Sequence, residues 1–526
     1  FFSTHTPPHP ILSGLVGSEM CIRDSATSAR TIAYLSDEIW RHIESDSNDQ
    51  LSLDVAVAGL DVIDNEIVVV GDPSTDPLLV LHAAVQSMHS GLPIARHSLM
   101  LLAERQTALP DPWPQGARDL FDDLLGGGSR SIPVIESLDY FEVWTHLLPE
   151  WAPNRSRPQR NVYHRFTVDR HLLETVAEAS RLAHRVSRPD LLVVASLLHD
   201  IGKGYPGDHT EVGMTLVGPI ATRCGFSEVD AKVLIRLVEH HLLLPDVATR
   251  RDLEDMQTIR GVAEKVETVE FLELLAALTE ADSIATGPTA WGDWKAYLVE
   301  TLAEATATFI SGEGGTRRRR RSFVTEEIEQ LMAGGETVVQ GAGDTVTIVA
   351  PDRAGTFSRA AGALALRGLD VLQADAYSSN AGMAVSQFRV AEPDAPVDWV
   401  RVTEDVHRCL EGLLAIDARI EERAHVYRRR TALAAKEVST SVTFDVESAT
   451  DATIVEVRTE DHIGVLYHLT RTLAEMGLDI RSAKIQTLSN EVVDTFYVTT
   501  SRVPILEIGH QREIEAALRH SLKRIE

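Results

Sequence analysis

An apolar segment in the middle of the chain ends on two ionisable residues. The stretch SLLHDIGKGYPGDHTEVG, residues 196–213, places His199 and Asp200 after a hydrophobic helical pattern and follows them with a glycine-rich turn. Burying an imidazole and a carboxylate without partners costs on the order of several kcal/mol each. A divalent metal ion is one partner that satisfies both groups together. The stretch therefore predicts a metal site at the end of this helix.

Other segments with a helical period carry the same residue types. His171 lies near the start of one, His240 and His241 end another, and Asp282 lies within a further apolar helix. Two histidines and two carboxylates from separate helices leave coordination positions open for water, which a bound metal ion activates for hydrolysis. Mixed nitrogen and oxygen donors suit Mn, Fe, Zn, Co or Mg, so the donor set alone does not choose among these ions.

The order His, His-Asp, Asp resembles that of the HD superfamily of metal-dependent phosphohydrolases. The segments LLHDIGKG, DHTEVG and LTEADSIATG carry the resemblance together. It implies hydrolysis of a phosphoester with a divalent ion, Mn or Mg, as cofactor. The metal ligands that it implies are His171, His199, Asp200 and Asp282.

The same resemblance assigns roles to residues around the ligands. The catalytic candidates are Asp200, Lys203 and His209. Of these, Lys203 is expected to neutralise a phosphate oxygen. The candidates for a second metal ion or for phosphate contact are His209, His240 and His241. His164 is expected on the same helix face as His171, in a structural or supporting role.

The rest of the chain must position these residues, and its patterns change along the sequence. We expect a multidomain α+β protein in which an all-α HD-type domain precedes two ferredoxin-like βαββαβ units. The expected segments are an unreliable N-terminus without helical or strand period (1–25), a mainly helical region with a hairpin around Asp64 and Asn65 (26–157), the HD domain (158–310), a Gly- and Arg-rich linker (311–340) and the two units (341–435 and 436–526).

The two C-terminal units form an internal repeat. Asp352 matches Asp461 and Gly355 matches Gly464, so the copies are offset by 109 residues. Each copy has an apolar strand, an Asp-x-x-Gly turn and an amphipathic helix, and then returns through Gly-Leu-Asp into a further strand. A helix that begins at such a turn offers unpaired N–H groups and a partial positive charge, which suit a carboxylate.

The repeated units resemble ACT domains, small modules that bind amino acids. The resemblance implies effector binding at both strand-to-helix turns, through Asp352 and Gly355 in the first unit and Asp461 and Gly464 in the second. The alternative is that the glycines only shape the turns.

An HD domain followed by tandem ACT domains resembles the bifunctional uridylyltransferase/uridylyl-removing enzymes of bacterial nitrogen control. The resemblance implies that the HD domain hydrolyses the uridylyl–tyrosine phosphodiester on the PII signalling protein, and that the ACT pair senses glutamine. The family's transferase motif, a Gly-Ser followed by paired aspartates, is not found, since GGGSRS at residues 126–131 lacks the Asp-x-Asp. We therefore expect residues 26–157 to follow a missing nucleotidyltransferase domain, and this chain to be unable to transfer UMP.

Composition narrows the class of protein. A formal net charge of −28 disfavours binding to nucleic acid or to anionic lipid. No apolar run is long enough to span a membrane. The 3 cysteines are far apart and suit a reducing cytoplasm. The run of arginines at residues 317–321 is expected to be a solvated linker.

Two alternatives belong to other functional classes. One is an HD phosphohydrolase of another nucleotide, such as an alarmone. The other is a non-catalytic amino-acid sensor that uses its HD domain to bind a protein. The sequence also leaves uridylyl and adenylyl removal undistinguished.

Overall fold

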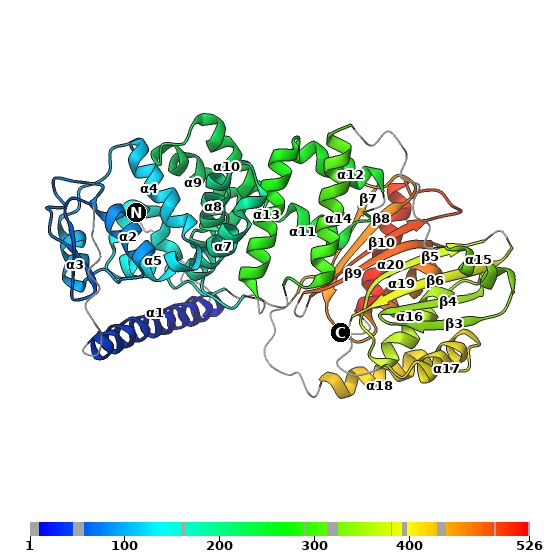
Figure 1. Ribbon diagram of the computed structural model, residues 1–526. Helices are drawn as coiled ribbons and strands as arrows, with labels where there is room; N and C mark the ends of the chain where they lie inside the picture. Colours follow the sequence, from blue (N-terminus) through cyan, green and yellow to red (C-terminus); the bar gives the residue numbers. More distant parts are fainter. Residues whose placement is uncertain are drawn as a thin grey trace, which may run out of the picture. The chain divides into compact units, whose positions relative to one another are not determined.

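The computed structural model describes residues 10–45, 57–159, 164–253, 255–287, 290–312, 324–379, 381–391, 397–428, 438–488 and 491–523 (Figure 1). The arginine run of the expected linker lies outside these residues. Contacts divide the chain into two compact units. The first comprises Phe1–Leu244 and Thr268–Tyr297, and the second comprises Pro245–Glu267 and Leu298–Glu526.

The first unit is mostly helical, as the sequence predicts. Its elements are α1 (Pro10–Ser45), β1 (Leu60–Ile63), β2 (Glu66–Val69), α2 (Leu79–Ser90), α3 (Arg96–Arg105), α4 (Gln115–Gly126), η1 (Gly128–Arg130), α5 (Ser131–Tyr140), α6 (Val143–Leu147), η2 (Pro149–Asn154), α7 (Val168–Leu182), η3 (Ala183–Arg185), α8 (Pro189–Leu198), η4 (Ile201–Gly204), α9 (His209–Arg223), α10 (Glu228–His240) and α13 (Val269–Thr286). The expected hairpin is β1 and β2, and its turn residues Asp64 and Asn65 both have positive φ.

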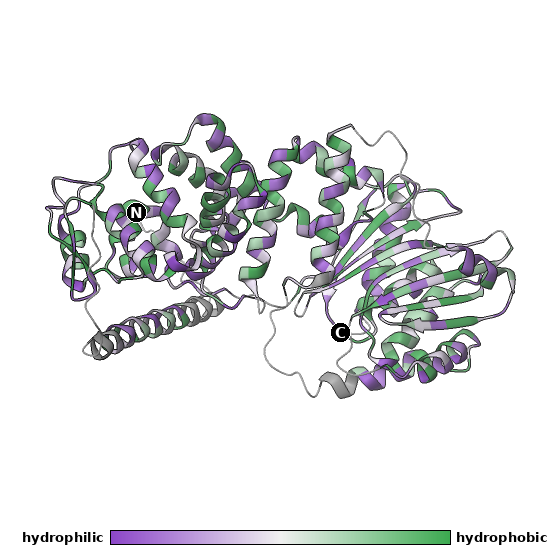
Figure 2. Ribbon diagram, in the orientation of Figure 1, coloured by the Kyte–Doolittle hydropathy of each residue, from purple (hydrophilic) through white to green (hydrophobic). Residues whose placement is uncertain are grey.

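Helix α8 lies at the centre of this unit. It begins with Pro189 in its first turn, where the missing N–H costs nothing, and every residue from Leu191 to Leu198 is buried. Helices α4, α7, α10 and α13 pack around it. Figure 2 shows α8 as a largely hydrophobic helix among helices of mixed character. A helix buried all round fixes the position of whatever follows its last turn, which is His199.

The N-terminal segment for which the sequence shows no period contains the start of a helix. Helix α1 starts at Pro10 and continues to Ser45. Arg23 donates from Nε to the carbonyl of Arg155 at 3.0 Å and from Nη2 to the carbonyl of Pro153 at 3.3 Å. Such long-range pairing supports a helix that shows no apolar period in the sequence.

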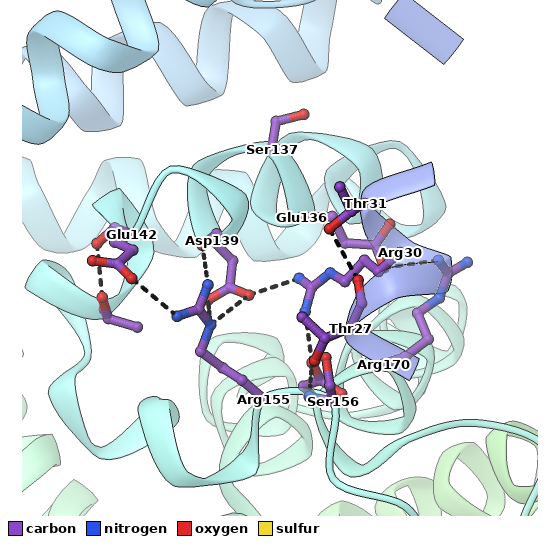
Figure 3. A network of polar contacts seen from close by, with 12 residues as sticks. Thr27, Arg30, Thr31, Glu136, Ser137, Asp139, Glu142, Arg155, Ser156 and Arg170 are labelled. Carbon is purple, nitrogen blue, oxygen red and sulfur yellow. Dashed lines mark hydrogen bonds and ion pairs between the residues drawn. The ribbon is translucent and has the colours of Figure 1, made fainter. Parts of the chain in front are cut away.

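A buried ionic network joins α1 to α5 and α7 (Figure 3). The guanidinium of Arg30 contacts Asp139 at 2.7 Å and Asp169 at 2.8 Å, and both carboxylates are nearly inaccessible to solvent. Asp139 also pairs with Arg155 at 3.1 Å, and Asp169 accepts the backbone N–H of Ser156 at 2.8 Å. Burial raises the pKa of Asp139, and the two arginines oppose that shift.

The second unit contains an eight-stranded antiparallel sheet in the order β3-β4-β6-β5-β9-β10-β8-β7. Its elements are α11 (Leu243–Arg250) and α14 (Asp293–Ile310), which both start in the first unit, α12 (Met256–Val266), α15 (Glu326–Ala333), β3 (Val338–Ala342), β4 (Thr345–Pro351), α16 (Thr356–Arg367), β5 (Val371–Ser378), β6 (Met383–Val390), α17 (Trp399–Leu410), α18 (Ile416–Arg428), β7 (Ser441–Asp445), β8 (Thr453–Glu460), α19 (Val465–Glu475), β9 (Asp479–Leu488), β10 (Glu491–Thr499) and α20 (Ile508–Leu522).

The internal repeat is present, but its element order differs from the expected βαββαβ. The first repeat runs from β3 to α17, with α18 following it, and the second runs from β7 to α20. In each repeat the edge strand comes first, which gives ββαββα. Each edge strand pairs antiparallel with the strand that directly follows it. The two repeats join through β5 and β9, where Ala374 pairs with Ala483. The mixed α+β class is thus confirmed, with the edge strand moved to the front of each unit.

Two expected boundaries also differ from the structure. Helix α15 lies within the expected linker, 311–340, and its Ile328 and Met332 pack against Val349 and Val385 of the sheet. This helix was not predicted because its 8 residues are too few to show a clear helical period. The expected HD domain, 158–310, is divided between the two units.

Opposite faces of the second repeat's sheet have different partners. Phe496 and Val498 belong to the apolar core that includes residues of α16 and α19, so Tyr497 between them faces the other way. On that face the Tyr497 hydroxyl accepts the N–H of Asp252 at 2.7 Å, and Arg250 donates to Gln486 at 3.1 Å. The segment between α11 and α12 therefore lies on this sheet.

Among the described residues, no helix combines the length and apolar character that a membrane crossing requires. All 3 cysteines are free thiols, with Cys224 and Cys409 buried and Cys21 exposed.

Replacing Arg30 tests the buried network. Arg30→Ala leaves Asp139 and Asp169 with less positive charge beside them, so we expect it to lower the free energy of unfolding by about 3 kcal/mol. Arg96→Ala is the matched control, because Arg96 also pairs with α1, through Glu38 at 2.9 Å, but is about half exposed. The control should cost less than about 1 kcal/mol. Urea unfolding followed by tryptophan fluorescence measures both; equal effects would contradict the assignment.

Candidate functional site

Four helices and one turn of the first unit bring the predicted metal ligands together. His171 lies in the first turns of α7, His199 caps α8, and Asp200 begins the η4 turn. Asp282 lies in the last turns of α13. His209 is the first residue of α9, whose N-terminus is capped by the side chain of Asp208.

The first group of donors contains His171, His199 and Asp282. The Nε2 atom of His171 lies 3.1 Å from Asp282 Oδ1 and 3.3 Å from His199 Nε2. His199 Nε2 lies 3.5 Å from the same Asp282 oxygen. Both imidazoles are buried. Three donor atoms that converge at such distances fit one divalent metal ion.

The second group contains Asp200, His209 and His241. Asp200 Oδ1 lies 3.7 Å from His209 Nε2 and 3.8 Å from His241 Nε2. The other oxygen of the same carboxylate, Oδ2, lies 3.3 Å from His199 Nε2 in the first group. Asp200 thus stands between the groups with one oxygen toward each, and each group would be able to hold one divalent ion.

Hydrogen bonds at the far side of two rings orient the donors. His199 Nδ1 lies 2.9 Å from the carbonyl of Ser196, and His241 Nδ1 lies 2.6 Å from the carbonyl of Val238. A carbonyl only accepts, so each Nδ1 carries a proton and each Nε2 is the nitrogen that faces the site, where it coordinates a metal ion once it is deprotonated. Backbone partners of this kind fix the ring orientation of metal-binding histidines.

The electrostatics of the group favour a bound cation. Burial works against a charged His199, yet Asp200 and Asp282 raise its pKa to about 10. Burial likewise opposes a charged Asp200, but Lys203 and His199 hold its pKa well below the usual range. Burial lowers the pKa of His241 to about 4, which keeps that ring neutral and able to coordinate.

Lys203 and His164 lie beside the donors. The Lys203 ammonium is 2.5 Å from Asp200 Oδ2 and also donates to Gln159 at 2.9 Å. The expected helical placement of His164 is wrong, because α7 starts at Val168 and His164 lies in the loop before it. Its ring is nevertheless 5.5 Å from that of His171, between centroids, and burial lowers its pKa to about 4. A supporting role fits this position.

Close backbone packing holds the η4 turn. A Cβ on Gly202 would overlap the carbonyl of His209, so only glycine allows α9 to start this close to the turn. Buried Asn154 donates to the carbonyl of Ile201 at 2.9 Å, and Arg157 donates to that of Gly204 at 3.0 Å. Sequence reasoning missed Asn154, Arg157 and Gln159, because these side chains lie in irregular structure without a period.

Among the candidate metal ligands, His240 alone is absent from both groups of donors found in the described residues. It ends α10, and its ring meets Phe271 edge-on with centroids 6.4 Å apart. Its neighbour His241 is buried in the second group. The ligand and catalytic roles themselves stay predictions.

The turn of the first repeat opens on a cavity of about 210 Å³. Its wall combines the turn Asp352–Ser358 with the end of α19 and the start of β9, including Ala474 and Gly477–Ile480. Gly355 has a φ of 85° and precedes the first residue of α16, a conformation that favours glycine. Gly464 has a φ of 90° at the same place before α19, but Ile420 packs against it.

Comparisons with known proteins bear on both units. Residues 168–286 match the family model described as HD domain. The chain is similar to proteins named bifunctional uridylyltransferase/uridylyl-removing enzyme from Streptomyces coelicolor (34% identity over 97% of this chain), Mycobacterium tuberculosis (39% over 82%) and Ruegeria pomeroyi (28% over 88%). The alignments span 69%, 56% and 58% of those relatives' own lengths, so the relatives are longer than this chain.

The adjacent histidines at the end of α10 provide a matched test of the second group of donors. His241→Ala removes a buried donor, so we expect it to weaken binding of a second Mn ion at least about tenfold. His240→Ala should leave Mn binding unchanged, because that ring faces Phe271 instead. Calorimetric titration of the full chain with Mn compares them. The assignment fails if the two variants behave alike.

Metal binding should also depend on pH in a defined direction. With a pKa of about 10, the His199 ring carries a proton at neutral pH that a metal ion must displace. Metal affinity should therefore rise about tenfold for each pH unit between pH 6 and pH 8 and fall as the pH is lowered. About one proton should be released per ion, as calorimetry in buffers of different ionisation enthalpy measures. Affinity that does not change with pH would show that His199 binds no metal.

Proposed function

The chain belongs to the family of bifunctional uridylyltransferase/uridylyl-removing enzymes, and from this membership we propose that its helical unit removes the nucleotidyl group from a tyrosine of the PII signalling protein. The observation that carries the proposal is the buried Asp200 carboxylate between two groups of histidine and carboxylate donors. Such a pair of cation sites suits a phosphodiester substrate. During hydrolysis, negative charge develops on the phosphoryl oxygens, and cations at the two sites would stabilise it.

Each residue group has a distinct part in this reaction. His171, His199 and Asp282 would hold one ion, and His209 and His241 the other, with Asp200 between them. A bound divalent ion supplies an acidified water and a positive charge for the phosphoryl oxygens. The ion is Mn or Mg in this proposal, because carboxylate oxygens and imidazoles accept either.

Two side chains at the edge of the site are placed for substrate and proton handling. The Lys203 side chain is 24% exposed, so its ammonium can turn from Asp200 to a phosphoryl oxygen that arrives from solvent. The His209 side chain is 31% exposed, so with only the first ion bound its ring would be able to pass a proton to the departing tyrosine oxygen. The more deeply buried donors have no such access.

The two repeats act as ACT domains that bind glutamine in this proposal. The residues that line the cavity at the first turn include Asp352 and Arg353 from the turn and Asp479 from the start of β9. An α-amino acid carries both charges, so its carboxylate suits Arg353 and the N-terminus of α16, and its ammonium suits an aspartate. The protein would work in the cytoplasm, where PII and free glutamine are found together.

Nucleotide release from modified PII tests the function. The full chain with Mn should release UMP from uridylylated PII, and glutamine should change the rate. Asp200→Ala should lower the release at least about a hundredfold, since it removes the carboxylate common to both donor groups. His240→Ala is the control and should retain activity. Mn binding without release would overturn the PII assignment, and release from adenylylated PII alone would change the nucleotide.

A further inference from the structure

The repeat creates two equivalent places around the α16 and α19 helices. In one, the turn before α16 faces the end of α19 and the start of β9 across the cavity described above. The offset of 109 residues between Gly355 and Gly464 assigns the other to the turn before α19, opposite the end of α16 at Gly368. Because α16 and α19 pack against each other, both places lie in one rigid core.

Helix α18 covers the second place. Ile420 is 1% exposed, and its Cγ2 lies 2.5 Å from where a Cβ on Gly464 would be. One turn earlier, Ile416 packs in the same way against Gly362 of α16. Arg423, one turn later, donates to the carbonyl of Leu366 in the last turn of α16. Three successive turns of α18 thus fill the space at the second turn that corresponds to the open cavity at the first turn.

We propose that α18 permanently closes the second place, so that the chain takes its amino-acid effector only at the turn from Asp352 to Ser358. The identity of the effector as glutamine rests on the function proposed above. The closure itself rests on α18 alone. At the first place the described residues leave a cavity open between the turn and the end of α19.

Chemical differences between the two places support this asymmetry. Ser386 lines the open cavity and pairs with Ile348, whereas the corresponding pair in the second repeat is Asp494 with Val457. Asp494 is fully buried, and neither of its oxygens has a hydrogen-bond partner among the described residues. Burial, with the nearby charge of Asp461, raises the pKa of Asp494 well above its usual range. The second place therefore has a buried carboxyl group where the open cavity has the hydroxyl of Ser386.

The covered place also indicates how the ligand lies in the open one. There, the guanidinium of Arg423 occupies the last turn of α16, where the helix dipole favours positive charge. The corresponding last turn of α19, at Ala474 and Gly477, lines the open cavity. The ammonium group of the effector therefore lies toward α19, and its carboxylate lies toward the N-terminus of α16.

Amide hydrogen exchange of the full chain, with and without glutamine, tests the closure. Glutamine should slow exchange at residues 353–358 and 474–480 at least about tenfold and leave residues 462–467 unchanged. Equilibrium dialysis should give one glutamine per chain. Ala474→Phe fills the open cavity and should abolish both effects. Protection of residues 462–467, or two glutamines per chain, would overturn the proposal.

A second measurement needs no ligand, so it separates closure from effector identity. In the ligand-free chain, Ile420→Ala should speed exchange at residues 462–467 at least about tenfold, because it removes the side chain that covers Gly464. Leu413→Ala, at an exposed residue just before α18, is the matched control and should have no effect. Unchanged exchange in Ile420→Ala would refute the closure. Absence of glutamine binding alongside faster exchange would refute only the effector.

Discussion

A single buried carboxylate imposes the constraint on which the helical unit depends. Asp200 is 3% exposed and follows a helix that is apolar on all sides, so water cannot compensate its charge. Every neighbour of this carboxylate is therefore a cation or a group that binds one. Lys203 is in direct contact, His199 retains a proton up to high pH, and His209 and His241 offer lone pairs to an ion. Positive charge beside Asp200 therefore serves two purposes. It compensates the buried carboxylate, and it provides the cations that the proposed chemistry needs.

Support for this carboxylate comes from segments far away in the sequence. The η2 turn holds η4 through Asn154, and α1 holds the η2 turn through Arg23. Arg30 of α1 pairs with Asp169 in the first turn of α7, two residues before His171. Helix α1 thus reaches the site through two chains of polar contacts without contributing a ligand. Such remote contacts keep donor atoms within the narrow distances that a metal ion tolerates.

The sequence was a good guide wherever a residue's role follows from local pattern. The donors on α7, α8 and α13 could be predicted because an ionisable residue in an apolar helix needs a partner. The choice between His240 and His241 could not be predicted. Neighbouring residues on a helix point about 100° apart, and only the packing of α10 decides which of the two faces inward. The order of strands in each repeat was missed because β3 and β7 are short edge strands, whose pairing is not visible locally. Helices α1 and α18 were missed because their partners are distant in the chain.

Pairing of β5 with β9 makes one continuous sheet from the two repeats. Two separate chains would need to associate to build such a sheet, and its amount would then vary with their concentration. Within one chain, the tether between the repeats keeps the local concentration of each for the other high and constant. The eight-stranded sheet is therefore assembled at any level of expression. Under the proposed function, a cell that makes little of this protein would respond to the effector over the same concentration range as a cell that makes much.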